Sequence, residues 1–207
     1  MAIPFTPAEI RRRYDDFADK YARMERWQEP LLGTTRLRRR LFSRARGDVL
    51  EVAAGTGLNF PHYDRDCRLT AVDMSPRMLE LAGRRAARLG LDIDLTVMDA
   101  GALEFPDDSF DTVTSSLTLC TFPDPLLALR EMARVCRPTG QILLLEHGRS
   151  DREWFGRFQD RRADRHAQQL GCYWNRRPLE LVDQAGLTTV SSRGSLIEVF
   201  QTIEARP

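Results

Sequence analysis

Hydrophobic and polar positions change their spacing along the chain. After residue 47, short apolar runs bounded by glycine, proline or aspartate alternate with longer stretches in which apolar side chains recur every three or four positions. The short runs indicate buried strands, and the longer stretches indicate amphipathic helices. Strands are expected at residues 48–53, 69–73, 93–98, 111–116, 141–146, 187–192 and 197–204, and helices at 57–62, 76–89, 124–135 and 176–185.

The first 46 residues carry helical signals and no strand signal. Thr6 is a suitable cap, and Pro7 suits the first turn of a helix over residues 8–32. A second helix is expected near residues 34–45. Because strands and helices alternate afterwards, the pattern predicts an α/β fold with a parallel sheet and crossover helices. Asn175 and Gly186 are the expected cap and stop of the last helix.

A chain of 207 residues is most simply one domain. Its net charge of +1 gives no strong attraction to nucleic acid. Residues 1–47 are nevertheless basic, and Arg11–Arg13 and Arg38–Arg40 dominate this excess. Two interpretations stay open: a solvated helix face, or a surface for an anionic substrate or lipid headgroups.

The four cysteines, at positions 67, 120, 136 and 172, show no Cys-x-x-Cys spacing. They are expected to be reduced thiols of a cytoplasmic protein, with no metal site, and Cys120 is interpreted as a packing residue. The N-terminus lacks the apolar core of a signal peptide, and no apolar run reaches the ~20 residues of a membrane span.

The most informative segment is the turn after the first expected strand, where Glu51 precedes Gly55 and Gly57. A dinucleotide site would need a third glycine, and the two registers place Leu58 or Phe60 there. A phosphate loop would need Gly-Lys-Ser/Thr, which is absent. The remaining pattern, Glu-x-x-x-Gly-x-Gly, provides bare backbone for a ligand without phosphates, such as S-adenosylmethionine.

Two more carboxylates end successive strands. Asp73 follows Arg68–Val72 and is placed to accept both ribose hydroxyls, and Asp99 follows the next strand and is placed to accept the adenine amine. A single aspartate at a strand end is often only a helix cap, but three acidic residues at three successive strand ends favour a nucleoside site. Glu51 is expected to orient the turn or to meet the ligand's ammonium group through water.

With these motifs, residues 48–146 resemble the class I S-adenosylmethionine-dependent methyltransferases. The matching stretches are Val49–Gly57, Ala71–Leu79, Met98–Asp111 and Glu131–Gly140. The resemblance implies a Rossmann-like, doubly wound, seven-stranded sheet with an antiparallel last strand, an N-terminal helical lid (1–46), a cofactor-binding core (47–147), and a substrate-wall insertion with closing strands (148–207). One departure is Ala53, where the family usually has glycine. Alanine is tolerated if that residue keeps a negative φ.

The expected cofactor contacts combine the residue pattern with this resemblance. They are Glu51, Ala53, Gly55, Gly57, Asp73, Met74, Asp99, Ala100 and Ser116, together with Tyr14 and Tyr21. The two tyrosines either lie over the sulfonium, which favours an aromatic face, or pack in the core of an amphipathic helix. His147, at the end of the fifth strand, is the candidate catalytic residue. The alternative is a histidine that caps the strand.

The acceptor is expected to be a small molecule. Three further segments resemble a narrower group that contains alkyl thiol methyltransferases and bacterial phospholipid or quinone methyltransferases: Leu117–Cys120, Leu144–His147 and Gly171–Arg176. A thiol sulfur is therefore the leading acceptor, followed by nitrogen or oxygen, and a phospholipid amine or a quinone carbon is the alternative. Peripheral lipid contact and a monomer or weak homodimer are compatible with this interpretation, and a nucleic-acid substrate is disfavoured.

A non-enzymatic alternative is a regulatory protein that binds S-adenosylmethionine. A polar acceptor cavity around His147 favours the enzyme, whereas bulky apolar side chains there favour the regulator.

Overall fold

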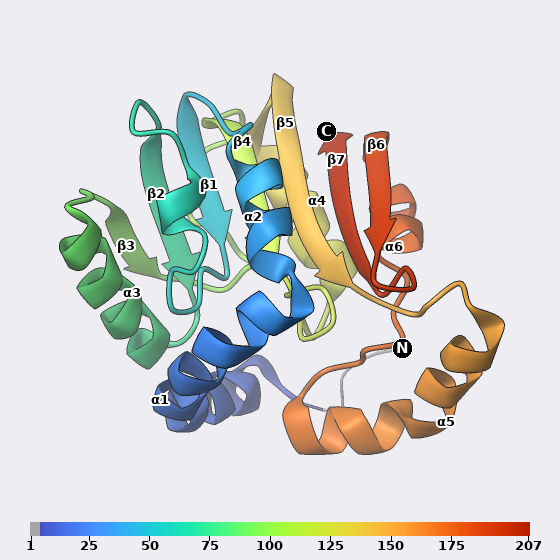
Figure 1. Ribbon diagram of the computed structural model, residues 1–207. Coiled ribbons are helices and arrows are strands. Elements are labelled where there is room, and N and C mark those ends of the chain that lie inside the picture. Colours follow the sequence, from blue (N-terminus) through green and yellow to red (C-terminus); the bar gives the residue numbers. More distant parts are fainter. Residues whose placement is uncertain (1–4) are drawn as a thin grey trace.

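The computed structural model describes residues 5–207, apart from the side chains at positions 26–28, 30 and 170. One sheet with strand order β3-β2-β1-β4-β5-β7-β6 forms the centre of the molecule (Figure 1). Its strands are β1 (Asp48–Val52), β2 (Arg68–Asp73), β3 (Asp94–Val97), β4 (Phe110–Ser116), β5 (Cys136–His147), β6 (Thr188–Ser195) and β7 (Phe200–Arg206). The last strand, β7, is antiparallel to both of its neighbours, and the remaining pairs are parallel. The predicted fold class is confirmed.

Helices cover both faces of this sheet. They are α1 (Pro7–Leu32), α2 (Thr34–Phe42), the short 3₁₀ helix η1 (Phe60–His62), α3 (Pro76–Leu89), α4 (Pro125–Val135), α5 (Glu153–Leu170) and α6 (Pro178–Gln184). In Figure 1, α2 lies in front of the sheet, and α4 and α6 lie behind it. Side chains of β5 alternate between two apolar layers, because successive residues of a strand point to opposite faces. Leu143 and Leu145 join the layer beneath α2 and α3, while Ile142 and Leu144 join the layer beneath α4 and α6.

A third apolar cluster lies beyond the carboxyl ends of the parallel strands. Ile10 of α1 packs there against Ala163 and Ala167 of α5 and against Tyr173. Figure 1 shows α1 and α5 below the arrowheads of the central strands. The two helices therefore cover the edge of the sheet at which parallel α/β folds bind their ligands.

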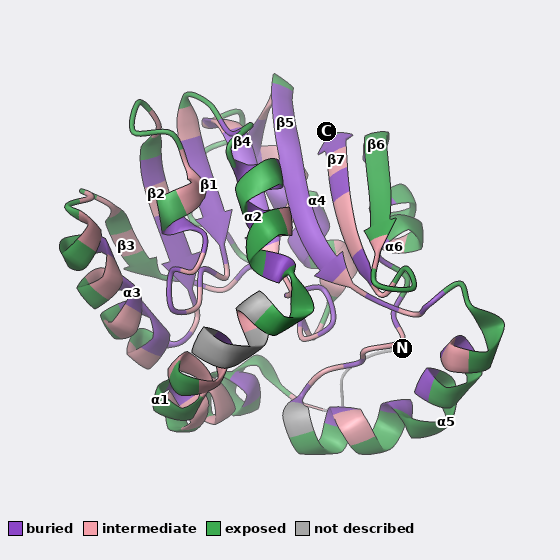
Figure 2. Cartoon of the chain, viewed as in Figure 1, coloured by how far each residue is buried: buried purple, intermediate pink, exposed green. Residues whose placement is uncertain are grey.

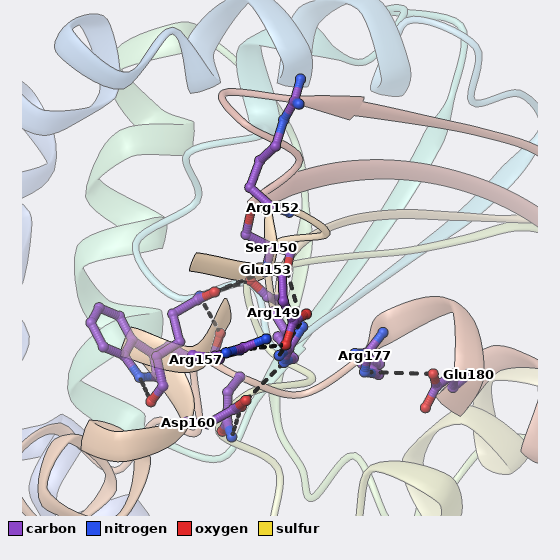
Figure 3. Close-up of polar contacts among 12 residues, drawn as sticks. Arg149, Ser150, Arg152, Glu153, Arg157, Asp160, Arg177 and Glu180 are labelled. Carbon is purple, nitrogen blue, oxygen red and sulfur yellow. Dashed lines mark hydrogen bonds and ion pairs between the residues drawn. The ribbon is translucent and has the colours of Figure 1, made fainter. Parts of the chain in front are cut away.

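The segment after β5 fixes α5 in place. Figure 3 shows Arg149 among the acidic side chains of α5, where its Nε donates to Asp160 Oδ2 at 2.9 Å. Gln159 Nε2 donates to the carbonyl oxygens of Gly148 at 3.0 Å and Trp174 at 3.1 Å. Gln159 is almost fully buried, so these bonds form away from competing water. These bonds hold α5 against the segment that precedes it and the segment that follows it.

Most expected elements are present, and three expectations are wrong. The helix expected at 57–62 is only the 3₁₀ turn η1, because Gly57 has a φ of 76° and Pro61 cannot donate a backbone hydrogen bond. The last helix begins at Pro178 and is preceded by Arg177, so Asn175 is not its cap; the Asn175 amide donates to Asp160 instead. The strand expected at 141–146 begins at Cys136.

The insertion 148–175 contains α5, which the pattern of apolar residues did not predict. The buried positions of this helix include Gly156, Gln159, Ala163 and Ala167, which are small or polar. A helix that buries such residues leaves no apolar stripe in the sequence, although the burial period itself is helical. The outer face of α5 is largely exposed (Figure 2).

Candidate functional site

The turn after β1 has three residues in the left-handed region of backbone conformation. The φ angles are 55° at Ala53, 56° at Gly55 and 76° at Gly57. A Cβ atom at Gly57 would lie 2.4 Å from the ring of Phe60, whereas one at Gly55 would meet no atom within 4 Å. Glycine at position 57 therefore allows the turn to pack on Phe60, and glycine at position 55 leaves open space on the cavity side.

The condition given for tolerating alanine at position 53, a negative φ, is not met. An L-residue in the left-handed region costs roughly 1–2 kcal/mol relative to glycine. Backbone geometry thus favours the family's usual glycine at this position, and Ala53 adopts the same conformation under strain. Ala53 nevertheless lines the cavity, as predicted for a contact residue.

Asp73 joins the end of β2 to this turn. Its Oδ2 accepts a hydrogen bond from the Gly55 amide at 2.8 Å, and its Oδ1 accepts one from the Ser75 amide at 2.8 Å. Burial raises the pKa of the Asp73 carboxyl to about 6, although the two amides oppose the shift. Each oxygen still has a second lone pair, so the carboxylate retains capacity to accept hydroxyl donors.

Glu51 lies behind the turn and does not line the cavity. Its Oε1 accepts from Asn59 Nδ2 at 2.8 Å, and its Oε2 accepts from the Tyr63 hydroxyl at 3.0 Å. Burial raises the pKa of Glu51 to about 7, against these hydrogen bonds and the charge of Arg38. Of the two roles expected for Glu51, orienting the turn is the one that its contacts support.

Arg38 is the main site residue that the sequence did not reveal. It is buried, and its Nη1 donates to Asn59 Oδ1 at 2.7 Å and to Ser116 Oγ at 2.6 Å. Its Nε forms an ion pair with Glu29 at 2.9 Å. For Arg38, the solvated-face interpretation of the Arg38–Arg40 run is therefore wrong. A signal was present, since Arg38 falls on the buried side of α2 with Thr34, Leu41 and Phe42.

One cavity brings most of the predicted residues together. Tyr14 and Tyr21 of α1 line it together with Gly55 of the turn, and Arg38, Asp73 and Ser116 complete its walls. A second cavity contains Asp99, and Met74 lines both. Gly57, Ala100 and His147 are not among the residues that line either cavity. Asp99 Oδ1 accepts from the Gly101 amide at 2.9 Å, which orients the carboxylate at the end of its strand.

His147 is located beside two cysteines. Its Nε2 lies 3.5 Å from Cys172 Sγ, and Cys120 completes the group. Burial lowers the pKa of His147, but the neighbouring Cys120 thiol and Glu146 carboxylate raise it, and the net pKa lies above the ordinary value. We expected His147 to face the cleft. Its Nε2 atom is instead directed to the Cys172 sulfur.

Part of this chain is similar in sequence to a known protein family. Residues 50–144 match the family described as "Methyltransferase domain". This part of the chain is a class I S-adenosylmethionine-dependent methyltransferase domain. The matched residues run from β1 to the middle of β5, so they contain the glycine turn, Asp73 and Asp99.

Relatives of this chain differ in the substrates that their names give. Phosphatidylethanolamine N-methyltransferase of Cereibacter sphaeroides is 40% identical over 108 residues, which are 51% of this chain and 53% of the relative. Demethylmenaquinone methyltransferase of Renibacterium salmoninarum is 40% identical over 147 residues, which are 68% of this chain and 59% of the relative. The chain thus spans somewhat more than half the length of these curated relatives.

A solved structure supports the fold. The [4+2]-cyclase SpnF superposes with a TM-score of 0.79 and 18% identity, covering 99% of this chain and 98% of that one. At this identity the likeness shows the fold alone.

The site fits S-adenosylmethionine. The open space above Gly55 accommodates a ligand against bare backbone, and the buried Asp73 carboxylate has lone pairs left for hydroxyl donors. The buried guanidinium of Arg38 provides a positive charge on the same cavity. Within residues 5–207, no helix combines the length and apolar character that crossing a membrane requires.

Proposed function

We propose that this protein transfers a methyl group from S-adenosylmethionine to the sulfur of a small thiol. Asp73 accepts the ribose hydroxyls, and Asp99 binds the adenine in the second cavity. Gly55 presents its backbone to the amino-acid tail, and Arg38 attracts the tail's carboxylate. Met74, which lines both cavities, lies between the two binding regions.

Bound S-adenosylmethionine would supply the methyl group. As the new C–S bond to the acceptor forms, the sulfonium C–S bond breaks and the thiol proton leaves. The products are a thioether and S-adenosylhomocysteine. The residues of the chain align the acceptor and exclude water. Such alignment supplies roughly 7–11 kcal/mol of rate acceleration. Tyr14 and Tyr21 place aromatic faces on the cavity wall, which suits the positive charge of the donor.

The observation that supports a thiol is the chemistry of the cavity wall. Its described acidic and imidazole side chains comprise one carboxylate, Asp73, which already binds two backbone amides. Thr118, Thr121 and the tyrosines add hydroxyl groups but no effective base. A phenol or carbon acid would need a positioned base, whereas a thiol with a pKa near 8.5 needs little help.

An acceptor panel tests this proposal. Initial rates are measured with a thiol, a primary amine, a phenol and a quinol of similar size, using S-adenosylmethionine with a labelled methyl group. The thiol is expected to react fastest, with a rate that rises towards the thiol's pKa. Faster methylation of the phenol or quinol would contradict the proposal, and cofactor binding without any transfer would favour the regulatory alternative.

A second candidate acceptor is the amine of a phospholipid headgroup. The relative from Cereibacter sphaeroides carries this activity in its name. On the surface of α5, Trp154 is 70% exposed and Phe158 is 38% exposed, and Arg157, Arg161 and Arg162 are exposed on the same helix. Aromatic side chains among arginines suit an anionic membrane surface.

Vesicle sedimentation distinguishes this candidate. Binding to anionic vesicles that is lost in Trp154→Ser, together with methylation of their amine headgroups, would favour the phospholipid over the thiol. We also propose a cytoplasmic location, where the four free cysteines stay reduced, so these assays use a reducing buffer.

A further inference from the structure

Three side chains from distant parts of the chain lie close together beyond the carboxyl ends of β4 and β5. Cys120 lies in the loop after β4, His147 ends β5, and Cys172 follows α5. Their Sγ, Nε2 and Sγ atoms all lie within 4.8 Å of one another, and His147 Nε2 is 3.5 Å from Cys172 Sγ. No short sequence motif connects them, which is why the spacing of the cysteines predicted no metal site.

We propose that Cys120, His147 and Cys172 bind one thiophilic divalent cation of the zinc type. Two thiolates and one imidazole are ligands that zinc prefers, and soft sulfur ligands discriminate against magnesium and calcium. Three protein ligands leave a fourth tetrahedral position for water or another small ligand. The proposal is independent of the acceptor, because it concerns only the chain's own side chains.

The spacing of the three atoms fits such an ion. Zinc lies about 2.3 Å from thiolate sulfur and about 2.0–2.1 Å from imidazole nitrogen, so tetrahedral S–N and S–S edges are roughly 3.6 and 3.8 Å. The observed 3.5 Å between His147 and Cys172 already matches the first edge. The remaining pairs, which are at most 4.8 Å apart, need to close by at most about 1.2 Å.

Backbone hydrogen bonds hold both cysteines in position. The Tyr173 amide donates to the Cys120 carbonyl at 2.9 Å, which joins the loop after β4 to the segment after α5. His166 Nδ1 lies 2.8 Å from the Cys172 carbonyl oxygen, and its ring stacks on Trp174 with centroids 4.5 Å apart. Metal sites are built in this way, with supporting contacts that fix the ligands before the ion binds.

A positively charged side chain lies beside the two cysteines. Arg176 donates to the Phe122 carbonyl at 2.8 Å, and its guanidinium interacts electrostatically with both Cys120 and Cys172. Its positive charge and that of a divalent ion together exceed the two negative charges of the ligands. A disulfide between the cysteines would require an oxidant and would leave His147 without a role, whereas a metal ion uses all three side chains.

Metal binding to the intact protein, after treatment with a chelator and a reductant, tests the proposal. Zn²⁺ is titrated against a chromophoric competitor, and Co²⁺ is followed by its thiolate charge-transfer absorption. Wild type is expected to bind one equivalent of Zn²⁺ and to melt at a higher temperature with it. Cys172→Ser is expected to weaken binding more than about tenfold. The matched control Cys67→Ser, which removes a half-buried thiol that bonds to the Ala45 carbonyl, should bind as wild type does.

His147→Gln provides a second variant in case Cys172→Ser does not fold. It keeps a polar side chain on β5 and should lose affinity in the same way. Equal Zn²⁺ affinity in wild type, Cys172→Ser and His147→Gln would overturn the proposal. So would a Cys120–Cys172 disulfide in the purified protein with no metal uptake after its reduction.

Discussion

The Asp73 carboxylate and the Gly55 amide lie 2.8 Å apart, so the end of β2 holds the turn that follows β1. The two strands are parallel neighbours, which brings their carboxyl ends to the same edge of the sheet. The buried Asp73 side chain therefore holds the Gly55 backbone in place, and it also provides a carboxylate on the cavity wall. The cofactor site depends on this coupling.

Asp73→Ala is expected to weaken S-adenosylmethionine binding by about 1.5–3 kcal/mol, the value of a hydrogen bond to a charged group. Loss of the Gly55 contact adds to the effect by loosening the turn. Calorimetry measures the change, and Asp92→Ala, at an exposed acid between α3 and β3, is the control. Unchanged affinity in Asp73→Ala would show that this carboxylate does not bind the cofactor.

Cofactor binding is also expected to depend on pH. Burial raises the pKa of Asp73 to about 6, and a protonated carboxyl is a poorer acceptor for ribose hydroxyls. The affinity should therefore fall as the pH drops through about 6. Asp73→Asn has no proton to gain, so its weaker affinity should stay flat over the same range. Binding titrations from roughly one pH unit below to two units above this pKa compare the two proteins.

Glu51→Gln tests the pH dependence of stability. The pKa of Glu51 is raised by burial from 4.5 to about 7 in the folded protein. A raised carboxyl pKa stabilises the fold fully below the unfolded value, and this contribution is lost as the pH rises through the folded value. A shift of this size corresponds to about 3 kcal/mol. Urea unfolding should show that the free energy of unfolding falls more steeply with rising pH in wild type than in the variant. Parallel curves would contradict a raised pKa.

Ala53→Gly is expected to stabilise the protein. Glycine relieves roughly 1–2 kcal/mol of strain from the left-handed conformation. Its greater freedom in the unfolded chain lowers the free energy of unfolding by about 0.4–1 kcal/mol. The net gain is therefore about 1 kcal/mol in the free energy of unfolding. Gly33→Ala, at a φ of 70° with no neighbouring atom within 4 Å, is the reverse control and should destabilise. A destabilised Ala53→Gly would mean that the methyl group packs favourably.

A comparison of Arg38→Lys with Arg39→Lys distinguishes the role of a buried arginine from that of its exposed neighbour. Lysine keeps the charge but loses the planar fork that bonds Glu29, Asn59 and Ser116. We expect a loss of about 1–3 kcal/mol in stability, together with weaker cofactor binding. Arg39→Lys, one residue along α2 on the exposed face, should stay within about 0.5 kcal/mol of wild type. Similar effects in both variants would rule out the special role of Arg38.

The sequence predicted the sheet well because its central strands are buried on both faces. Short apolar runs such as Leu143–Leu145, bounded by turn residues, are typical of such strands, and the turn at Gly55 and the carboxylate of Asp73 follow directly from the strand ends. The side chains that α5 and α2 add to the site were harder to predict. Cys172 reaches His147 only because α5 folds back on α1, and Arg38 resembles a surface residue until its partners are known.

The acceptor atom is tested most directly with a molecule that offers two nucleophiles. In 4-aminothiophenol both the thiol and the aromatic amine are reactive near neutral pH, so they compete within one substrate. The protein is incubated with S-adenosylmethionine bearing a trideuteriomethyl group, and mass spectrometry locates the label, with Asp73→Ala as the control for uncatalysed transfer. The account predicts a labelled thioether and one S-adenosylhomocysteine per product. Label on nitrogen, or no transfer above the Asp73→Ala background, would contradict it.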